Sequence, residues 1–275
     1  MALISDSTNG KGNAAPVAAE LYTREYFLGD CEGYRPFLEH QGAVLSHRLE
    51  SFYKRLVVRP DDRVLEIACG RGEICNLLAP RVRSVVGTDY APSAISICQE
   101  TYKNSGHKNL QFVVADAKSL PFPDHSFDLV FCSEFLEHVH DWELHEVMKE
   151  IVRVLSPNGR LICQTEPNRL YRFFASTWSF LPRAIQALRK GRKIAFLLER
   201  PDGHVQFHVN EQTYWSVRRL LRLYFHESRV ETYEMVLGMN RLLRFIFNGY
   251  PLNKLPLVRR FFDREIFVYA ARPRK

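Results

Sequence analysis

The chain has 275 residues, of which 46% are hydrophobic and 25% are charged, and its formal net charge is +7. This length and composition are typical of one large α/β domain and exclude a chain that is disordered throughout. Apolar runs are short, and the most apolar stretch outside the expected core, Phe173–Leu181, is interrupted by serine and threonine. We therefore predict no transmembrane helix.

The charge is distributed unevenly along the chain. From Arg169 onward there are 21 lysines and arginines and 8 acidic residues. Residues 1–168 contain 17 lysines and arginines and 23 acidic residues. The basic C-terminal part predicts an anionic partner, unless these charges only keep a solvated surface soluble.

The N-terminal part is expected to lie outside the main sheet. Residues 1–19 are predicted to be a flexible leader without the pattern of a secretion signal, which favours a cytoplasmic protein. Residues 20–58 are predicted to form a lid or helical segment ahead of the main domain, residues 59–275. The six cysteines show no CxxC spacing, so we expect reduced thiols that act as apolar filler.

Strand and helix patterns alternate in the middle of the chain. Strands are predicted over 64–68, 84–88, 110–114, 127–132 and 160–165, and helices over 41–56, 73–78, 93–103 and 142–155. An inserted helical segment is expected within about 171–210, followed by a helix over 211–224 and strands over 229–235 and 265–271. Such alternation predicts an α/β fold with a parallel, doubly wound sheet.

The stretch VLEIACGRGEI combines a strand, a turn with Gly70 and Gly72, and the start of a helix. Glycine lets the backbone approach a ligand, and open α/β sheets bind nucleotides at the carboxyl ends of their strands. Asp89 ends the second strand, where its carboxylate can accept hydrogen bonds from ribose hydroxyls. Cys75 replaces the third glycine of a dinucleotide site, and Glu66 would repel a pyrophosphate but attract an ammonium group. These features favour S-adenosylmethionine (SAM) over NAD.

Over about residues 60–167 the chain resembles the class I SAM-dependent methyltransferases, particularly the methyltransferase type 11 group. The resemblance rests on EIACGRG, TDYAPSAI, VVADAKSLPFPDHSFDLVFC and LSPNGRLI. It implies a Rossmann-like, doubly wound, mostly parallel seven-stranded sheet, with an N-terminal lid and a helical insertion after strand 5.

The resemblance also implies roles for individual residues. Tyr90 would lie against the adenine, while Asp116 and Ala117 would bind its amino group and ring nitrogen. Ala68 stands where the family usually has glycine, and we expect slight crowding there. Asp89 and Asp116 are also suited to capping a helix or turn. The predicted cofactor-binding residues are Glu66, Ala68, Gly70, Gly72, Asp89, Tyr90, Asp116, Ala117 and Ser133.

Glu134, Glu137 and His138 follow the fourth strand in an ExxEH pattern. This pattern resembles the metal-ligand motif of ubiquinone-pathway O-methyltransferases and small-RNA 2′-O-methyltransferases, and His204 or His208 could complete such a site. We favour a metal-free mechanism in which His138 or His208 acts as general base and Glu137 is the third catalytic candidate.

Two further segments bear on the acceptor. LYTREYFLGDCEGY resembles a segment of bacterial methyltransferases associated with glycan or lipid modification, and Tyr26, Tyr34 and Phe37 are candidate contacts or packing residues. The basic amphipathic stretch 183–193 suits an anionic membrane or a lipid-linked substrate, or a helix that covers the active site.

We therefore predict a cytoplasmic enzyme that methylates an oxygen of a small-molecule, glycan or lipid-linked acceptor. An anionic acceptor and peripheral contact at the inner membrane face are further expectations. The alternatives are an RNA 2′-O-methyltransferase-like enzyme with a metal site and a non-catalytic SAM-binding protein. A nucleic acid is the less favoured partner because no separate RNA-binding module is evident.

Overall fold

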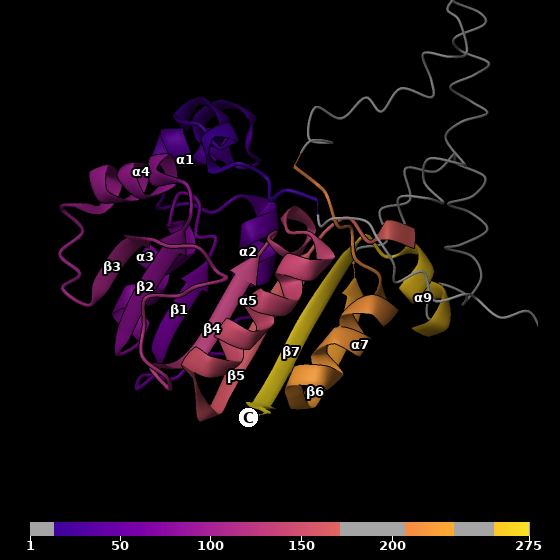
Figure 1. Cartoon of the computed structure of the whole chain (residues 1–275). Coiled ribbons are helices and arrows are strands. Elements are labelled where there is room, and N and C mark those ends of the chain that lie inside the picture. Colours follow the sequence, from indigo (N-terminus) through magenta and orange to yellow (C-terminus); the bar gives the residue numbers. More distant parts are fainter. Residues whose placement is uncertain (1–13, 171–206, 234–255, 275) are drawn as a thin grey trace, which may run out of the picture.

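The computed structural model describes residues 14–170, 207–233 and 256–274. Its sheet has seven strands in the order β3-β2-β1-β4-β5-β7-β6 (Figure 1). Strands β1 to β5 are parallel, and β7 runs antiparallel to both β5 and β6. The predicted Rossmann-like, mostly parallel seven-stranded sheet is thus confirmed. The strands are β1 (Arg63–Ile67), β2 (Ser84–Asp89), β3 (Leu110–Val114), β4 (Phe127–Ser133), β5 (Leu155–Thr165), β6 (Phe225–Tyr233) and β7 (Glu265–Pro273).

Helices lie against the sheet and beyond the upper ends of its strands in Figure 1. They are α1 (Tyr34–His40), α2 (His47–Tyr53), α3 (Glu73–Leu78), α4 (Pro92–Tyr102), α5 (Asp141–Val154), α7 (Tyr214–Tyr224) and α9 (Pro256–Phe262). The N-terminal elements lie near the end of the sheet where β1 and β2 finish, which places them beside the predicted site. No helix within the described ranges is long and apolar enough to cross a bilayer.

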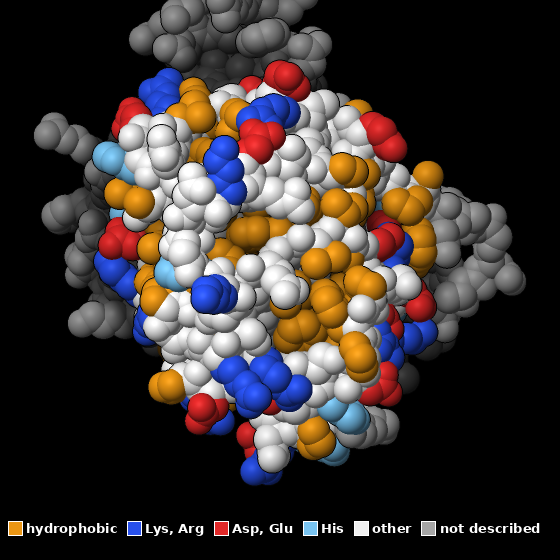
Figure 2. Space-filling model, turned by 90° about the vertical axis from the view of Figure 1, so that its left-hand side faces the viewer, with side chains coloured by type: hydrophobic (Ala, Val, Ile, Leu, Met, Phe, Trp, Pro, Cys, Tyr) orange, Lys and Arg blue, Asp and Glu red, His pale blue; other side chains and the backbone are white. Residues whose placement is uncertain are grey.

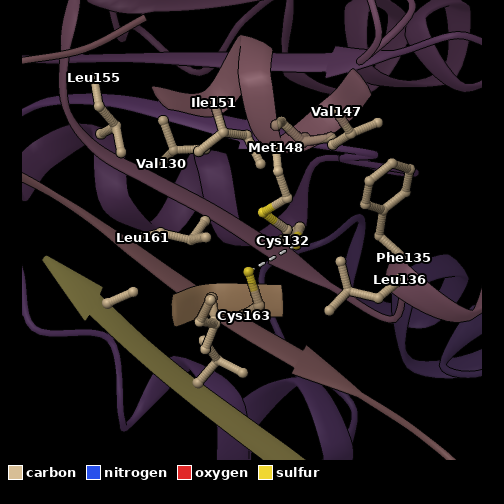
Figure 3. Packing of buried hydrophobic residues seen from close by; sticks show 14 of the residues in the cluster. Val130, Cys132, Phe135, Leu136, Val147, Met148, Ile151, Leu155, Leu161 and Cys163 are labelled. Atoms are coloured by element: carbon tan, nitrogen blue, oxygen red, sulfur yellow. Dashed lines mark hydrogen bonds between the residues drawn. The ribbon is translucent and has the colours of Figure 1, made fainter. Parts of the chain in front are cut away.

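The core between α5 and the middle of the sheet is built from residues at helical spacing (Figure 3). Val147, Met148 and Ile151 of α5 are fully buried and pack toward Val130 of β4 and Leu161 of β5. In the same cluster the thiols of the adjacent strands β4 and β5 lie 3.2 Å apart, Cys132 to Cys163. All six cysteines are free, in agreement with the expectation of reduced thiols.

One edge of the sheet is formed by β3, next to α4. Figure 2 shows this side of the molecule, with hydrophobic side chains gathered near its middle and Lys and Arg side chains around them. Val114 of β3 is among the exposed apolar residues. The burial of β3 is therefore incomplete, as is usual for an edge strand.

The predicted helix over 41–56 is confirmed only over α2, His47–Tyr53, and its predicted bounds are wrong. Helix α1 ends at His40 because Gln41 adopts a left-handed conformation, with φ of 49°. A new helix, α2, starts after Ser46, whose hydroxyl accepts a hydrogen bond from the Leu49 N–H at 3.3 Å. Strand β6 also begins earlier than predicted, at Phe225. Of the expected insertion within about 171–210, residues 171–206 lie outside the described residues, and with them the basic stretch 183–193 and His204.

Candidate functional site

The turn after β1 carries three residues in the left-handed region, Ala68, Gly70 and Gly72, with φ of 54°, 52° and 74°. A Cβ on Gly72 would lie 2.6 Å from the Phe112 ring, so close packing against β3 requires glycine there. A Cβ on Gly70 would meet only the Phe27 ring, at 3.7 Å, which leaves room beside this turn. Ala68 adopts this conformation although its Cβ makes the left-handed region unfavourable.

Glu66 lies in β1 directly before this turn and is buried. The Cys75 thiol donates a hydrogen bond to its carboxyl group at 2.8 Å. Burial raises the pKa of Glu66 to about 8, because ionisation away from water is unfavourable. A cation beside Glu66 would favour its charged form.

Asp89 at the end of β2 connects the β1 turn to the start of α4. Its two carboxylate oxygens accept hydrogen bonds from the Gly70 N–H and the Ala91 N–H, each at 3.0 Å. Burial raises the pKa of Asp89 to about 6, although these backbone donors oppose the shift. Each carboxylate oxygen can accept a second hydrogen bond, so Asp89 can hold the turn and a ligand together.

The remaining predicted cofactor residues follow β2, β3 and β4. Tyr90 donates a hydrogen bond to the Val17 carbonyl at 3.2 Å. Asp116 accepts from the Lys118 N–H at 2.9 Å and pairs with the Lys118 ammonium at 3.0 Å, which is the turn-capping arrangement. Ala117 packs against the main core cluster. Ser133 ends β4 with a buried hydroxyl that has no hydrogen-bond partner among the described residues.

The two candidate basic histidines meet in the structure. The rings of His138 and His208 lie 4.9 Å apart between centroids, although 70 positions separate them in the sequence. The Tyr22 hydroxyl lies 3.0 Å from His138 Nδ1. Burial raises the pKa of Tyr22 above its ordinary value, so this side chain stays a neutral phenol. The arrangement places two proton-accepting rings and one fixed hydroxyl together.

Glu134, Glu137 and His138 engage separate partners. Glu134, with φ of 55°, forms an ion pair with Arg48 at 3.2 Å. Glu137 is fully buried, accepts a hydrogen bond from the Thr165 hydroxyl at 2.7 Å, and has its pKa raised to about 7 by burial. No group of three or more His, Cys, Asp or Glu side chains within the described ranges has the arrangement of a metal site.

Three residues of the site were missed in the sequence: Tyr22, Arg48 and Arg71. Arg71, within the glycine turn, donates hydrogen bonds to the Phe27 carbonyl at 2.9 Å and the Glu32 carbonyl at 2.8 Å, and so fixes the N-terminal segment to the turn. Its place between two turn glycines is the one signal that pointed to it.

The three aromatic residues predicted as candidate acceptor contacts lie in different surroundings. Tyr26 packs against Tyr22 and Phe207, with ring centroids 5.3 and 4.9 Å away. Phe37 is buried beneath the Arg71 guanidinium at 5.2 Å. The Tyr34 hydroxyl accepts a hydrogen bond from Arg35 Nε at 3.1 Å. Of the three, Tyr26 lies nearest the histidine pair through its contact with Tyr22.

Comparison with known proteins identifies similar sequences and folds. A family model described as a methyltransferase domain matches residues 65–163. The demethylmenaquinone methyltransferase of Symbiobacterium thermophilum is 32% identical over 181 residues, covering 61% of this chain and 70% of that enzyme. The 27-O-demethylrifamycin SV methyltransferase of Amycolatopsis mediterranei is 36% identical over 133 residues, covering 45% of this chain and 44% of that enzyme.

The crystal structure of the YcgJ protein of Bacillus subtilis has a TM-score of 0.53 and 20% identity, covering 83% of this chain and 99% of that one. This likeness shows the fold. In sequence, the match to the uncharacterized methyltransferase YcgJ spans 40% of its length, so the chain covers less than half of two of these curated relatives.

Proposed function

Since the chain belongs to the class I SAM-dependent methyltransferases, we propose that it transfers the methyl group of SAM to an oxygen atom of a small-molecule, glycan or lipid-linked acceptor. The proposal of an oxygen acceptor rests on the contact of His138 with Tyr22 and His208. A hydroxyl acceptor must lose its proton, and a histidine can accept it. The Amycolatopsis relative is named for a 27-O-demethylated acceptor, which agrees with this chemistry.

The residues at the β1 turn fit the cofactor. Asp89 retains one acceptor position on each oxygen for the ribose hydroxyls, and Gly70 has free space beside it. Glu66 supplies a carboxyl group for the methionine ammonium, and the buried Ser133 hydroxyl lacks a partner within the described chain. Tyr90, Asp116 and Ala117 follow β2 and β3, where the adenine would lie.

The proposed chemistry divides between cofactor and protein. When bound, the cofactor supplies an electrophilic methyl group on a sulfonium sulfur. His138 or His208 accepts the one proton that the acceptor hydroxyl loses, and Tyr22 orients the His138 ring through Nδ1. Glu137, with its pKa near neutrality, lies behind this pair; its main-chain carbonyl accepts a hydrogen bond from the Asn210 N–H at 3.0 Å, which holds the 207–210 segment in place.

The function is tested by incubating the purified chain with SAM and fractions of a cell extract, and by following S-adenosylhomocysteine formation. Mass spectrometry should identify a product heavier by about 14 Da, one methylene, and fragmentation should place the added methyl on oxygen. A product methylated on carbon or nitrogen would contradict the proposed acceptor, while an extract that yields no product in any fraction would favour a non-catalytic SAM-binding protein.

Replacing Asp89 with alanine should weaken SAM binding by roughly 1.5–3 kcal/mol, because hydrogen bonds to a charged acceptor are lost. The loss should exceed that of the ribose contacts alone, since Asp89 also holds the Gly70 and Ala91 amides. Isothermal titration calorimetry with S-adenosylhomocysteine measures it, after circular dichroism shows that the variant is folded. Unchanged affinity would remove Asp89 from the cofactor site.

The affinity for SAM should also depend on pH through Asp89. Because the pKa of Asp89 in the unliganded chain is about 6, its carboxyl group becomes protonated below this pH and loses acceptor capacity. Through Asp89 alone, the dissociation constant should therefore rise about tenfold between pH 7 and pH 5. The matched variant Asp89→Asn should bind more weakly at pH 7 and have a pH dependence that is weaker by this factor, and the dependence that remains belongs to Glu66, whose pKa is about 8. A pH profile shared by both proteins would assign the titration to another group.

A further inference from the structure

The solvent-facing side of α7 is basic and bears apolar residues at both ends. Its exposed residues recur at positions i, i+3, i+4, i+7 and i+8, which places them on one helix face. Trp215 and Leu223 are 39% and 58% exposed. Three arginines lie between them. We call this set the α7 face: Trp215, Arg218, Arg219, Arg222 and Leu223.

The packing of α7 fixes the direction of this face. Val217, Leu220 and Leu221 are buried in the main core cluster on the other side of the helix. Thr213 caps the first turn by accepting a hydrogen bond from the Ser216 N–H at 3.0 Å. Because rotation of α7 would expose these core residues, the arginines are held toward solvent in a fixed array.

Helix α9 lies beside α7 and extends the surface (Figure 1). The Trp215 ring contacts the Phe261 ring, with centroids 5.1 Å apart, and the Arg260 guanidinium lies 4.4 Å from the Tyr214 ring centroid. Leu257 of α9 is 59% exposed. The apolar residues thus continue from the first turn of α7 onto the neighbouring helix.

The arginines of the α7 face have no carboxylate partner in the part of the chain that the structure describes, where the ion pairs join other residues. Helix α7 itself contains no acidic residue. Three positive charges on one rigid face, without a carboxylate partner within the described ranges, complement an anionic surface. The flanking tryptophan and leucines complement the boundary between lipid headgroups and acyl chains, where tryptophan is enriched.

The α7 face begins near the carboxyl ends of the parallel strands, where the candidate site also lies. Five positions before Trp215, the Asn210 N–H donates a hydrogen bond to the Glu137 carbonyl at 3.0 Å. Strand β7, which follows α9, starts beside the end of β5, where Ile266 pairs with Thr165. The first turn of α7, with Trp215, therefore lies toward the strand ends that carry the histidine pair.

We propose that the α7 face, together with Leu257, docks the chain onto an anionic lipid bilayer. The arginines bind the headgroups, and Trp215, Leu223 and Leu257 enter the boundary region. A nucleic acid would use the same charges, but it would gain nothing from the exposed leucines. The contact requires no methyl acceptor, so its test stands apart from the test of the proposed reaction.

Sedimentation of the full-length chain with vesicles tests the proposal. Vesicles of phosphatidylcholine alone should leave the chain in the supernatant, whereas an equimolar mixture with phosphatidylglycerol should sediment it, less so as salt is added. Replacing Arg218, Arg219 and Arg222 together by glutamine should lower the partition coefficient on the order of 100-fold, or about fivefold per arginine. The affinity for S-adenosylhomocysteine should stay unchanged, which shows that the variant is folded.

The matched control removes three positive charges at the opposite edge of the sheet, by replacing exposed Arg83, Lys103 and Lys108 with glutamine. Six strand spacings of about 4.8 Å each separate β3 from β6, far more than the Debye length of about 10 Å in 0.1 M salt. The control should therefore bind within about twofold of the original chain. Equal losses in both variants would show that net charge alone drives binding and would overturn the proposed surface.

Fluorescence locates the contact independently. In a Trp142→Phe, Trp178→Phe background, Trp215 is the remaining tryptophan, and its emission should shift to shorter wavelength with anionic vesicles. An unchanged emission spectrum on sedimented protein would place the membrane contact elsewhere. Single-stranded RNA that displaces the chain from vesicles at equal charge concentration, with a steeper salt dependence, would replace the bilayer by a nucleic acid as the partner.

Discussion

Replacing Arg71 with methionine is expected to lower the free energy of unfolding by about 3–5 kcal/mol, because it leaves the buried Glu73 carboxylate without its counter-charge. Arg71 is 3% exposed and lies 3.0 Å from Glu73. Its other hydrogen bonds go to the carbonyls of Phe27 and Glu32, which also lose their donors. Burial already raises the pKa of Glu73, so proton uptake should limit the loss to this range. Urea denaturation at pH 7 measures the change.

The double variant Arg71→Met, Glu73→Met is the control. It removes both charges, so it should regain more than half of the lost stability if the unpaired carboxylate is the cause. In the single variant, amide hydrogen exchange should also increase over residues 22–33, which Arg71 holds to the glycine turn. A single variant within about 1 kcal/mol of the original chain would show that the N-terminal segment is held by its aromatic packing instead.

Replacing His138 with asparagine is expected to lower the rate of methyl transfer to an oxygen acceptor by roughly 10²- to 10⁴-fold, the usual contribution of a general base. The affinity for SAM should stay unchanged, because the proposed cofactor contacts, at the ends of β1 to β4, do not include His138. Single-turnover measurements with the acceptor found in the extract screen separate the chemical step from binding.

Two variants sharpen this test. His208→Asn should lower the rate as well if the two rings act together, since they contact each other. Tyr22→Phe keeps the aromatic packing with Tyr26 and Phe207 but removes the hydroxyl beside His138 Nδ1. It should lower the rate less than loss of the base itself. Full activity of His138→Asn would assign proton removal to another group or indicate an acceptor that needs no base.

The regular part of the fold was predictable because its signals are local. Strand β3 and helix α3 have the bounds that their apolar patterns predict, and Asp89 ends its strand as expected. Each depends on the periodicity of a few adjacent residues and on glycines at the turn. The same reasoning failed at Gln41, where a residue other than glycine takes a left-handed conformation and ends α1.

The sequence predicted several residues of the site by their type, but it did not predict most of the contacts between them. His138 was named from its residue type and its place after β4, and His208 from its residue type in a later segment, and the structure brings them together. Tyr22 was not identified, because 116 positions separate it from His138 and no local pattern records that contact. The ExxEH pattern resembles a metal-ligand motif, but Glu134 has a left-handed backbone conformation and forms an ion pair with Arg48.

The position of β7 determines the order in which the sheet can form. This strand is the last described element in the chain, yet it lies between β5 and β6 and hydrogen-bonds to both. During synthesis, the edges of β5 and β6 that pair with β7 therefore stay unpaired until residues 265–273 have emerged from the ribosome. Ile266, Val268 and Ala270 then complete the core that α5 and α7 cover. Until that moment, the exposed edge of β5 is a site at which nascent chains can pair with one another, and a chaperone would be most useful there.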